Sequence, residues 1–220
     1  MKKIIIFLLV ILLSGCVARG DLKEELDAVF SSDNEAQTIR RNNYSSFVDY
    51  YVPSDTGELE GTLLSSSFVY NESRFVMDVN VSGILNDKYY KNIKLADEGF
   101  FDNSRKVYER QSTYIDSDGK SHEYIYKVFE YDDRFLSYFA SKDLVFYGYA
   151  TDSDIVNLSS RILLMAKGAT VRENDVIASY SSRNEIDYEK KQVNLFETIM
   201  PVNGNVNDFL IGREDAEASQ

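Results

Sequence analysis

Four strand-like runs follow one another between Lys106 and Ala150, and they constrain the fold more than any other part of the chain. The first two runs are joined by Asp118-Gly119, a dipeptide typical of two-residue β-hairpin turns. Short polar turns join the remaining runs, and strands joined by such short turns must pair antiparallel. The sequence therefore predicts an antiparallel meander, with strands expected at 106–117, 120–131, 134–140 and 144–150.

Helical patterns precede and follow the meander. Asp21 and Glu24 have the spacing of a capping box, and apolar residues follow them at helical spacing. After the meander, a second helical pattern runs from about Ser153 to Lys167 and stops at Gly168. It is apolar around nearly its whole circumference, which is typical of a buried helix. We therefore expect an α+β fold with an N-terminal helix, a curved antiparallel β-meander, and a buried helix packed on the meander's concave face.

Weaker patterns suggest the remaining elements. We expect a short helix at 34–41, a strand at 46–52, a loop at 54–61, a hairpin of strands 62–70 and 74–81, and a late strand at 192–200, for which a helix is the alternative. Thr170 and Glu173 have the spacing of another capping box.

The composition excludes several classes of protein. The 220 residues are 44% hydrophobic and 27% charged, which is typical of a globular chain. The formal charge of −12 argues against nucleic acid as a partner, because phosphates require a basic face. A single cysteine allows neither an intrachain disulfide nor a cysteine-based zinc site. The chain has no glycine-rich phosphate-binding motif, and we expect no cofactor and no metal.

The single cysteine, Cys16, follows a pattern typical of a secretory signal. Lys2 and Lys3 precede the apolar run Ile4–Leu13, which is about half the length needed to span a bilayer. The tetrapeptide Leu13-Ser14-Gly15-Cys16 resembles the lipobox of bacterial lipoproteins. That resemblance implies cleavage before Cys16 and a diacylglyceryl group on its sulfur. The alternative is an ordinary cleaved signal peptide in which Cys16 is an accidental thiol.

The resemblance divides the N-terminal part of the chain, and the sequence patterns divide the rest. Residues 1–15 would be the lipoprotein signal peptide, and residues 16–20 the lipidated Cys16 with a short linker. Residues 21–212 would form a single α+β domain, followed by an acidic flexible tail at 213–220. The mature protein would be held by its lipid anchor on the extracytoplasmic face of a bacterial cell membrane.

Residues capable of catalysis are few. His122 is the only histidine, and its place beside the Asp118-Gly119 turn is typical of an exposed cross-strand residue. The chain has no Gly-x-Ser-x-Gly nucleophile motif. Asp116-Ser117-Asp118-Gly119, with Ser121 and Glu123 downstream, faintly resembles a calcium loop. However, its glycine is fourth rather than sixth, so the EF-hand pattern fails. We predict no catalytic residue and no metal ligand.

Tyrosine is the unusual residue, because eight of the 16 tyrosines lie between Tyr108 and Tyr149. Strand alternation places two pairs on shared faces and suggests an aromatic surface that could stack on sugar rings or on a partner protein. Its candidate residues are Tyr124, Tyr126, Tyr147 and Tyr149. The alternative is that tyrosine simply suits a pleated, half-buried surface.

These observations predict a lipid-anchored, non-catalytic binding module of the cell envelope, contacting the membrane through Cys16 and a protein, glycan or lipid ligand through its domain. The first alternative is a carrier of lipid or another hydrophobic ligand, with a cavity between sheet and helix. The second alternative is a cell-envelope hydrolase that uses paired carboxylates, one with a raised pKa.

Overall fold

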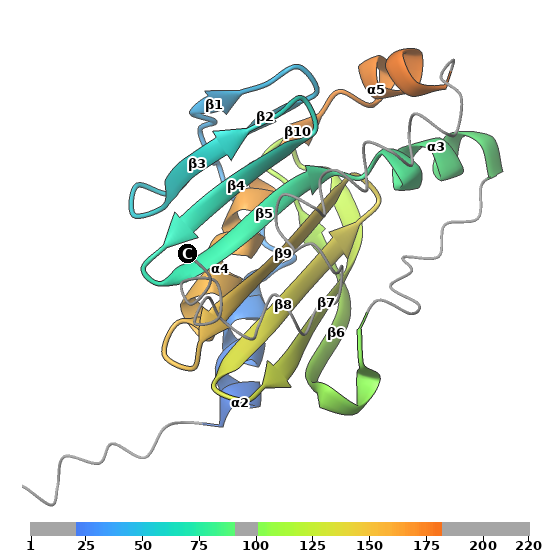
Figure 1. The fold of residues 1–220 in the computed structure, drawn as a ribbon. Coiled ribbons are helices and arrows are strands. Elements are labelled where there is room, and N and C mark those ends of the chain that lie inside the picture. Colours follow the sequence, from blue (N-terminus) through green and yellow to red (C-terminus); the bar gives the residue numbers. More distant parts are fainter. Residues whose placement is uncertain (1–20, 91–100, 182–220) are drawn as a thin grey trace, which may run out of the picture.

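The computed structural model describes residues 21–90 and 101–181. In this part of the chain the main element is a seven-stranded antiparallel sheet in the order β3-β4-β5-β9-β8-β7-β6 (Figure 1). Its strands are β3 (Gly57–Gly61), β4 (Ser65–Tyr70), β5 (Ser73–Val79), β6 (Lys106–Ile115), β7 (Ser121–Tyr131), β8 (Arg134–Ser141) and β9 (Leu144–Thr151). Strands β3–β5 form one antiparallel unit, strands β6–β9 form another, and β9 pairs with β5 to join them.

The predicted meander is confirmed as strands β6–β9. Gly119 adopts a φ of 80° in the β6–β7 turn, a conformation open to glycine at little cost. Asp132 takes a φ of 53° in the β7–β8 turn, where the short aspartate side chain tolerates the left-handed region. The predicted hairpin before the meander is also present as β4 and β5. These strands pair from Ser65 opposite Asp78 to Tyr70 opposite Ser73.

Both strongly predicted helices are present. Helix α2 (Leu22–Val29) begins after Asp21, whose carboxylate accepts a hydrogen bond from the Lys23 backbone N–H at 2.9 Å. Helix α4 (Ile155–Lys167) ends at Gly168, and most of its residues are buried. The two helices pack against each other and lie behind the sheet in Figure 1. We call the sheet face that they cover the inner face.

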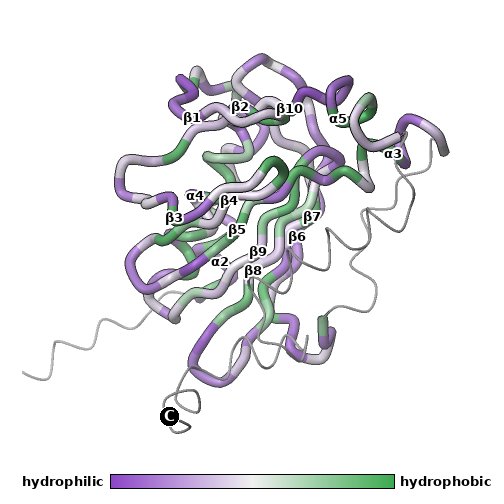
Figure 2. The backbone as a smooth tube through the Cα atoms, turned by 45° about the horizontal axis from the view of Figure 1, so that its top comes forward, coloured by the Kyte–Doolittle hydropathy of each residue, from purple (hydrophilic) through white to green (hydrophobic). Residues whose placement is uncertain are grey.

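Aromatic rings fill the space between the inner face and these helices. The Phe30 ring of the short helix η1 (Phe30–Ser32) lies 4.7 Å from the Tyr126 ring, measured between centroids. The Phe139 ring lies 5.1 Å from Tyr124 and 5.7 Å from Phe146. Figure 2 shows hydrophobic residues concentrated in central strands such as β5 and β9, with hydrophilic residues in the turns. The inner face is therefore a packed aromatic core.

Smaller elements lie at the two ends of the sheet. Strands β1 (Asn43–Tyr44), β2 (Val48–Tyr50) and β10 (Thr170–Val171) form a three-stranded sheet. Helices α3 (Val81–Tyr90) and α5 (Glu173–Tyr180) pack together beyond the end of β5, which we call the α5 end. The short helix η2 (Asn103–Arg105) contacts β7 at the opposite end, the η2 end. None of the described helices combines the length and the apolar character needed to cross a membrane.

Several weaker predictions are wrong. Residues 34–41 are not helical, and Arg41 instead reaches the β6–β7 turn, where its guanidinium donates to Ser117 at 2.9 Å. The segment 54–61 contains strand β3 because pairing with β4 satisfies its backbone, which overrides its poor strand propensity. The strand expected at 46–52 is shortened to β2.

The second capping box does not form. Thr170 belongs to β10, while the residue that precedes α5 is Arg172, which makes no side-chain capping bond. Cys16, the strand expected at 192–200 and the tail at 213–220 lie outside the described residues.

Candidate functional site

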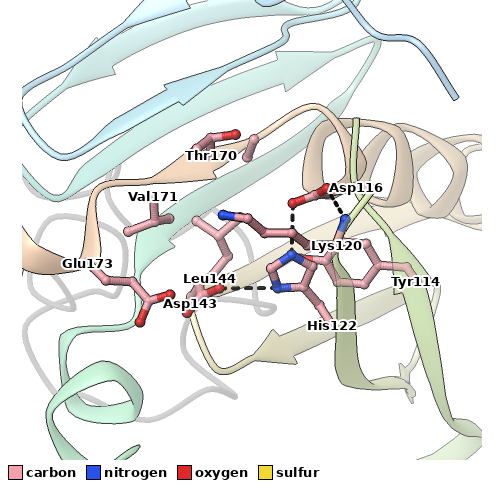
Figure 3. A pocket seen from close by; sticks show the side chains of 10 residues that line it. Tyr114, Asp116, Lys120, His122, Asp143, Leu144, Thr170, Val171 and Glu173 are labelled. Atoms are coloured by element: carbon pink, nitrogen blue, oxygen red, sulfur yellow. Dashed lines mark hydrogen bonds and ion pairs between the residues drawn. The ribbon is translucent and has the colours of Figure 1, made fainter. Parts of the chain in front are cut away.

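At the α5 end of the sheet, His122 lies between two carboxylates (Figure 3). Its Nε2 atom is 2.9 Å from Oδ2 of Asp116, and its Nδ1 atom is 3.2 Å from Oδ2 of Asp143. Asp116 follows β6 directly, whereas Asp143 lies in the turn between β8 and β9. Antiparallel pairing brings both turns to the same end of the sheet, so these two residues converge although they are far apart in the sequence.

The surroundings fix the geometry of this group. Asp116 is 3% exposed, and its second carboxylate oxygen accepts backbone N–H bonds from Asp118 at 2.9 Å and Lys120 at 2.8 Å. The Tyr114 ring stacks on the imidazole with centroids 5.0 Å apart and an interplanar angle of 14°. The hairpin turn therefore orients Asp116, and Asp116 and Tyr114 together orient His122.

The electrostatic balance at His122 favours the imidazolium form. Burial opposes the charge, but hydrogen bonds and Coulombic attraction from Asp143 and Asp116 outweigh it, so the pKa of His122 is raised above its ordinary value. An imidazole whose two nitrogens both face carboxylate oxygens must donate from both, which requires both protons. His122 is thus a largely buried cation between two anions.

A pocket of about 30 Å³ adjoins the imidazole and reaches β10 and the start of α5. A space of this size holds a few water molecules. Lys142 lies beside it, with its ammonium 2.9 Å from Glu173 of α5 and 3.5 Å from Asp143. These charges connect the β8–β9 turn to α5, while Thr170 of β10 donates to Asp118 in the β6–β7 turn at 2.8 Å. The site therefore links both turns to β10 and α5.

The arrangement differs from the predicted role of His122. Its side chain is 17% exposed rather than open to solvent, because Asp116, Asp143 and Tyr114 enclose it. Asp116 is close to His122 in the sequence, on the other side of the same hairpin turn. No sequence pattern indicated that Asp143 would also lie beside His122. Oδ1 of Asp116 accepts the backbone N–H groups of Asp118 and Lys120, as in a tight turn. Within residues 21–90 and 101–181, no group of three or more His, Cys, Asp or Glu side chains is placed to hold a metal ion.

A second buried ion cluster lies beneath β6. Asp33 is 1% exposed and accepts hydrogen bonds from the Tyr124 hydroxyl at 2.8 Å and the Arg110 guanidinium at 3.0 Å. Burial alone would raise the pKa of Asp33, but these hydrogen bonds outweigh it and lower the pKa below its ordinary value. Arg110 also donates to the carbonyl of Phe30 at 3.1 Å, so the cluster fastens η1 to the sheet.

The prediction that Tyr124 and Tyr126 belong to an aromatic binding surface is wrong. They are 1% and 0% exposed because the even-numbered residues of β7 point to the inner face. Tyr124 bonds Asp33, and the Tyr126 hydroxyl lies 2.6 Å from Ser159 of α4. Strand alternation was sufficient to pair these tyrosines but did not show which face the helices cover.

Tyr147 and Tyr149 lie on the opposite face and are half-buried. The Tyr147 hydroxyl donates to Asp78, while the Tyr149 ring packs near the Arg134 guanidinium, 5.3 Å from its centroid. The four predicted tyrosines therefore divide between two faces and do not form one binding surface.

No protein-family model matches the chain, and no curated protein matches it. Among solved structures, a protein from Bacteroides thetaiotaomicron is similar over 62% of this chain and 49% of its own, with 10% identity and a TM-score of 0.27. Our chain thus spans about half the length of that protein. LpqN of Mycobacterium tuberculosis, described as involved in cell envelope biogenesis, is similar over 66% of this chain and 95% of its own, with 16% identity and a TM-score of 0.32. Similarity at this level establishes neither a shared fold nor a shared function.

Proposed function

We propose that the protein is a bacterial lipoprotein, anchored by lipid on Cys16 at the extracytoplasmic face of the cell membrane, and that its domain is a non-catalytic binding module. The observation that carries the anchor is the tetrapeptide Leu13-Ser14-Gly15-Cys16 directly after the apolar run Ile4–Leu13. Two acyl chains on one cysteine are sufficient for stable membrane attachment.

The positions of the two sheet ends support a defined orientation on the membrane. Helix α2 begins at Leu22, near the η2 end, because Asp27 within it accepts from Tyr108 near the start of β6. The His122 pocket lies at the other end of β6, a ten-residue strand, and therefore about 30 Å away. Residues 16–20 reach only about 15 Å in extended form. The anchored domain would present the His122 pocket away from the lipid surface.

A binding role without catalysis is supported by the chemistry of this pocket. Both nitrogens of His122 are occupied by carboxylates, so the ring has no lone pair with which to take a proton from a substrate. The pocket has room for only a few water molecules, so a glycan or peptide substrate would not fit inside it. Asp116 and Asp143 neutralise the imidazolium, whereas the hydrolase alternative requires a carboxylate pair that flanks a substrate.

The carrier alternative requires an apolar cavity between the sheet and α4. The inner core around Phe30, Tyr124 and Phe139 is instead filled by aromatic rings. The centroids of neighbouring rings lie 4.7 to 6.0 Å apart. This packing favours a binding surface on the outside of the domain over a ligand cavity within it.

Metabolic labelling with a radioactive or alkyne-tagged palmitate tests the anchor. We expect wild-type protein to incorporate label and to sediment with membranes. Cys16→Ser should lose both properties because it removes the sulfur that carries the lipid. Ser14→Ala is the matched control, since it keeps a small residue in the tetrapeptide and should still be labelled. Unchanged labelling of Cys16→Ser would refute the lipoprotein assignment.

Affinity capture from solubilised membranes tests the binding role and its location. Lys120 is exposed at the α5 end, and Lys106 is exposed at the η2 end. We expect Lys120→Glu to reduce capture of the partner at least tenfold, because it reverses a charge at the outward end. Lys106→Glu makes the same change at the membrane-facing end and should leave capture unchanged. Equal capture by both variants would contradict binding at the α5 end.

A further inference from the structure

Strand β3 forms one edge of the seven-stranded sheet (Figure 1). It pairs with β4 on one side, and all five of its residues are exposed. No other strand in the described part of the chain pairs with it. An edge strand directs alternate backbone N–H and C=O groups outward, where another extended chain can bond to them. The β3 edge is therefore open to strand addition.

The opposite edge of the sheet, formed by β6, is partly closed by the chain itself. The Ile115 N–H donates to the carbonyl of Asp33 at 3.1 Å, and the Thr113 hydroxyl donates to the Asn34 side chain at 2.6 Å. Residues 33 and 34 thus occupy the end of β6 at which a strand could be added. Among the described segments, none occupies the β3 edge in this way.

The side chains of the β3 edge combine negative charge with apolar surface. Glu58 and Glu60 flank Leu59, which is 54% exposed. Leu63, in the turn that follows β3, is 53% exposed. A segment that pairs with β3 would therefore meet two carboxylates and two leucine side chains.

The charge at this edge is not neutralised by neighbouring side chains. Residues 42–73 contain five acidic residues and neither lysine nor arginine. The two aspartates of this segment form ion pairs with Arg161 and Arg172. Glu58 accepts a hydrogen bond from the Tyr50 hydroxyl at 2.7 Å. Within the described part of the chain, Glu58 and Glu60 have no ion-pair partner, so the edge favours a basic ligand.

The same residues disfavour pairing with a second copy of the chain. Antiparallel pairing of two β3 strands about Leu59 would place Glu58 of one copy opposite Glu60 of the other, and like charges directly opposite each other destabilise a sheet. The register shifts between Glu58 and Glu60. Such a bulge increases the local twist and hinders flat association of two edges. A single flexible segment can follow this twist.

We propose that β3 binds an extended, basic segment of a partner protein by strand addition. Lysine or arginine side chains of the segment pair with Glu58 and Glu60, and an apolar side chain contacts Leu59. In this mode of recognition, backbone hydrogen bonds supply affinity and side chains supply specificity. The five residues of β3 span about 17 Å, so about five to seven residues of the partner are sufficient. The edge is distinct from the His122 pocket, and the proposal goes beyond the lipid anchor and does not depend on it.

Titration of the full chain with defined peptides, followed by NMR, tests this proposal. The probe is a seven-residue peptide with blocked ends that alternates lysine and valine. We expect it to shift the amide signals of residues 57–61 and to slow their hydrogen exchange, because new hydrogen bonds form at the edge. A peptide that alternates glutamate and valine should bind about tenfold more weakly or not at all. Equal binding of the two peptides would refute the basic ligand.

A third peptide separates strand addition from simple charge attraction. The lysine–valine peptide with every backbone nitrogen methylated keeps its charge but cannot donate backbone hydrogen bonds. We expect it to lose binding. Unchanged binding of this peptide would overturn strand addition, as would signal changes centred on β6 instead of β3.

Matched variants of the protein locate the site. Glu60→Lys should weaken binding of the lysine–valine peptide about tenfold, because it reverses a charge at the edge. Glu130→Lys makes the same change at an exposed position of β7 and should leave the affinity unchanged. Circular dichroism establishes that both variants fold. Equal affinities of the two variants would contradict a site at β3, and a dimer of the wild-type chain that pairs through β3 would assign the edge to a second copy.

Discussion

At the scale of single residues, His122 is the most informative side chain, because one ring reports on two turns of the sheet. It is also the only histidine in the chain, so its ring protons give one isolated titration. Its position between Asp116 and Asp143 makes its charge a part of the folded structure.

We predict that the NMR titration midpoint of His122 lies above its ordinary value of 6.5 and falls in Asp143→Asn, because the amide no longer favours the imidazolium. Loss of this charged hydrogen bond should also lower the free energy of unfolding by about 2 kcal/mol. Asp133→Asn, in the exposed β7–β8 turn, should change neither quantity. An unchanged midpoint in Asp143→Asn would show that the carboxylate does not control the ring.

At the scale of elements, the sequence predicted what depends on local chemistry. The meander was predictable because Asp118-Gly119 defines a turn and each strand alternates, and α4 was predictable because Gly168 ends an apolar helical pattern. Strand β3 was not predictable, since Gly57–Gly61 becomes a strand only through pairing with β4. The order of the strands was also beyond local patterns, because β9 pairs with β5 across a long stretch of sequence.

The candidate site follows the same division. Asp116 and His122 lie close together in the sequence and flank one turn, so their proximity could have been inferred. Asp143 joins them only because β7 pairs with β8, which brings the turn before β9 to the same sheet end. The buried tyrosines were missed for a related reason. Alternation gives two faces but does not identify the face that α4 covers, and that decides the exposure of Tyr126.

At the scale of the whole molecule, three buried groups give the folded state a preference for mildly acidic solution. The folded pKa of Asp78 is raised to about 6 from 3.8, so its ionisation destabilises the fold as pH rises through that interval. The pKa of His122 is raised above 6.5 in the folded state. Its contribution to stability is therefore complete below pH 6.5 and is lost as the pH rises through the pKa of the folded state. The pKa of Asp33 is lowered below 3.8, so its contribution is present above 3.8 and is lost in stronger acid.

We therefore predict that stability is greatest at about pH 4 and declines as the pH rises through 6. Urea unfolding at pH 5 and pH 8 should show a lower free energy of unfolding at pH 8, with Asp78 contributing about 1.4 kcal/mol to the difference. Asp78→Asn should reduce this difference, since the amide does not titrate. Asp133→Asn provides the exposed control and should retain it. Stability that rises steadily from pH 5 to pH 8 would contradict this account.

The single junction between β5 and β9 also bears on how the chain folds. Within β6–β9 each strand pairs with the strand next to it in sequence, and the same holds within β3–β5, so each unit can assemble by closing short loops. The pairing of β5 with β9 closes a much longer loop, whose entropic cost must be met before its contacts form. We expect this closure to be the rate-limiting step, and the exposed edges of the two half-sheets to be the surfaces most prone to association before it occurs.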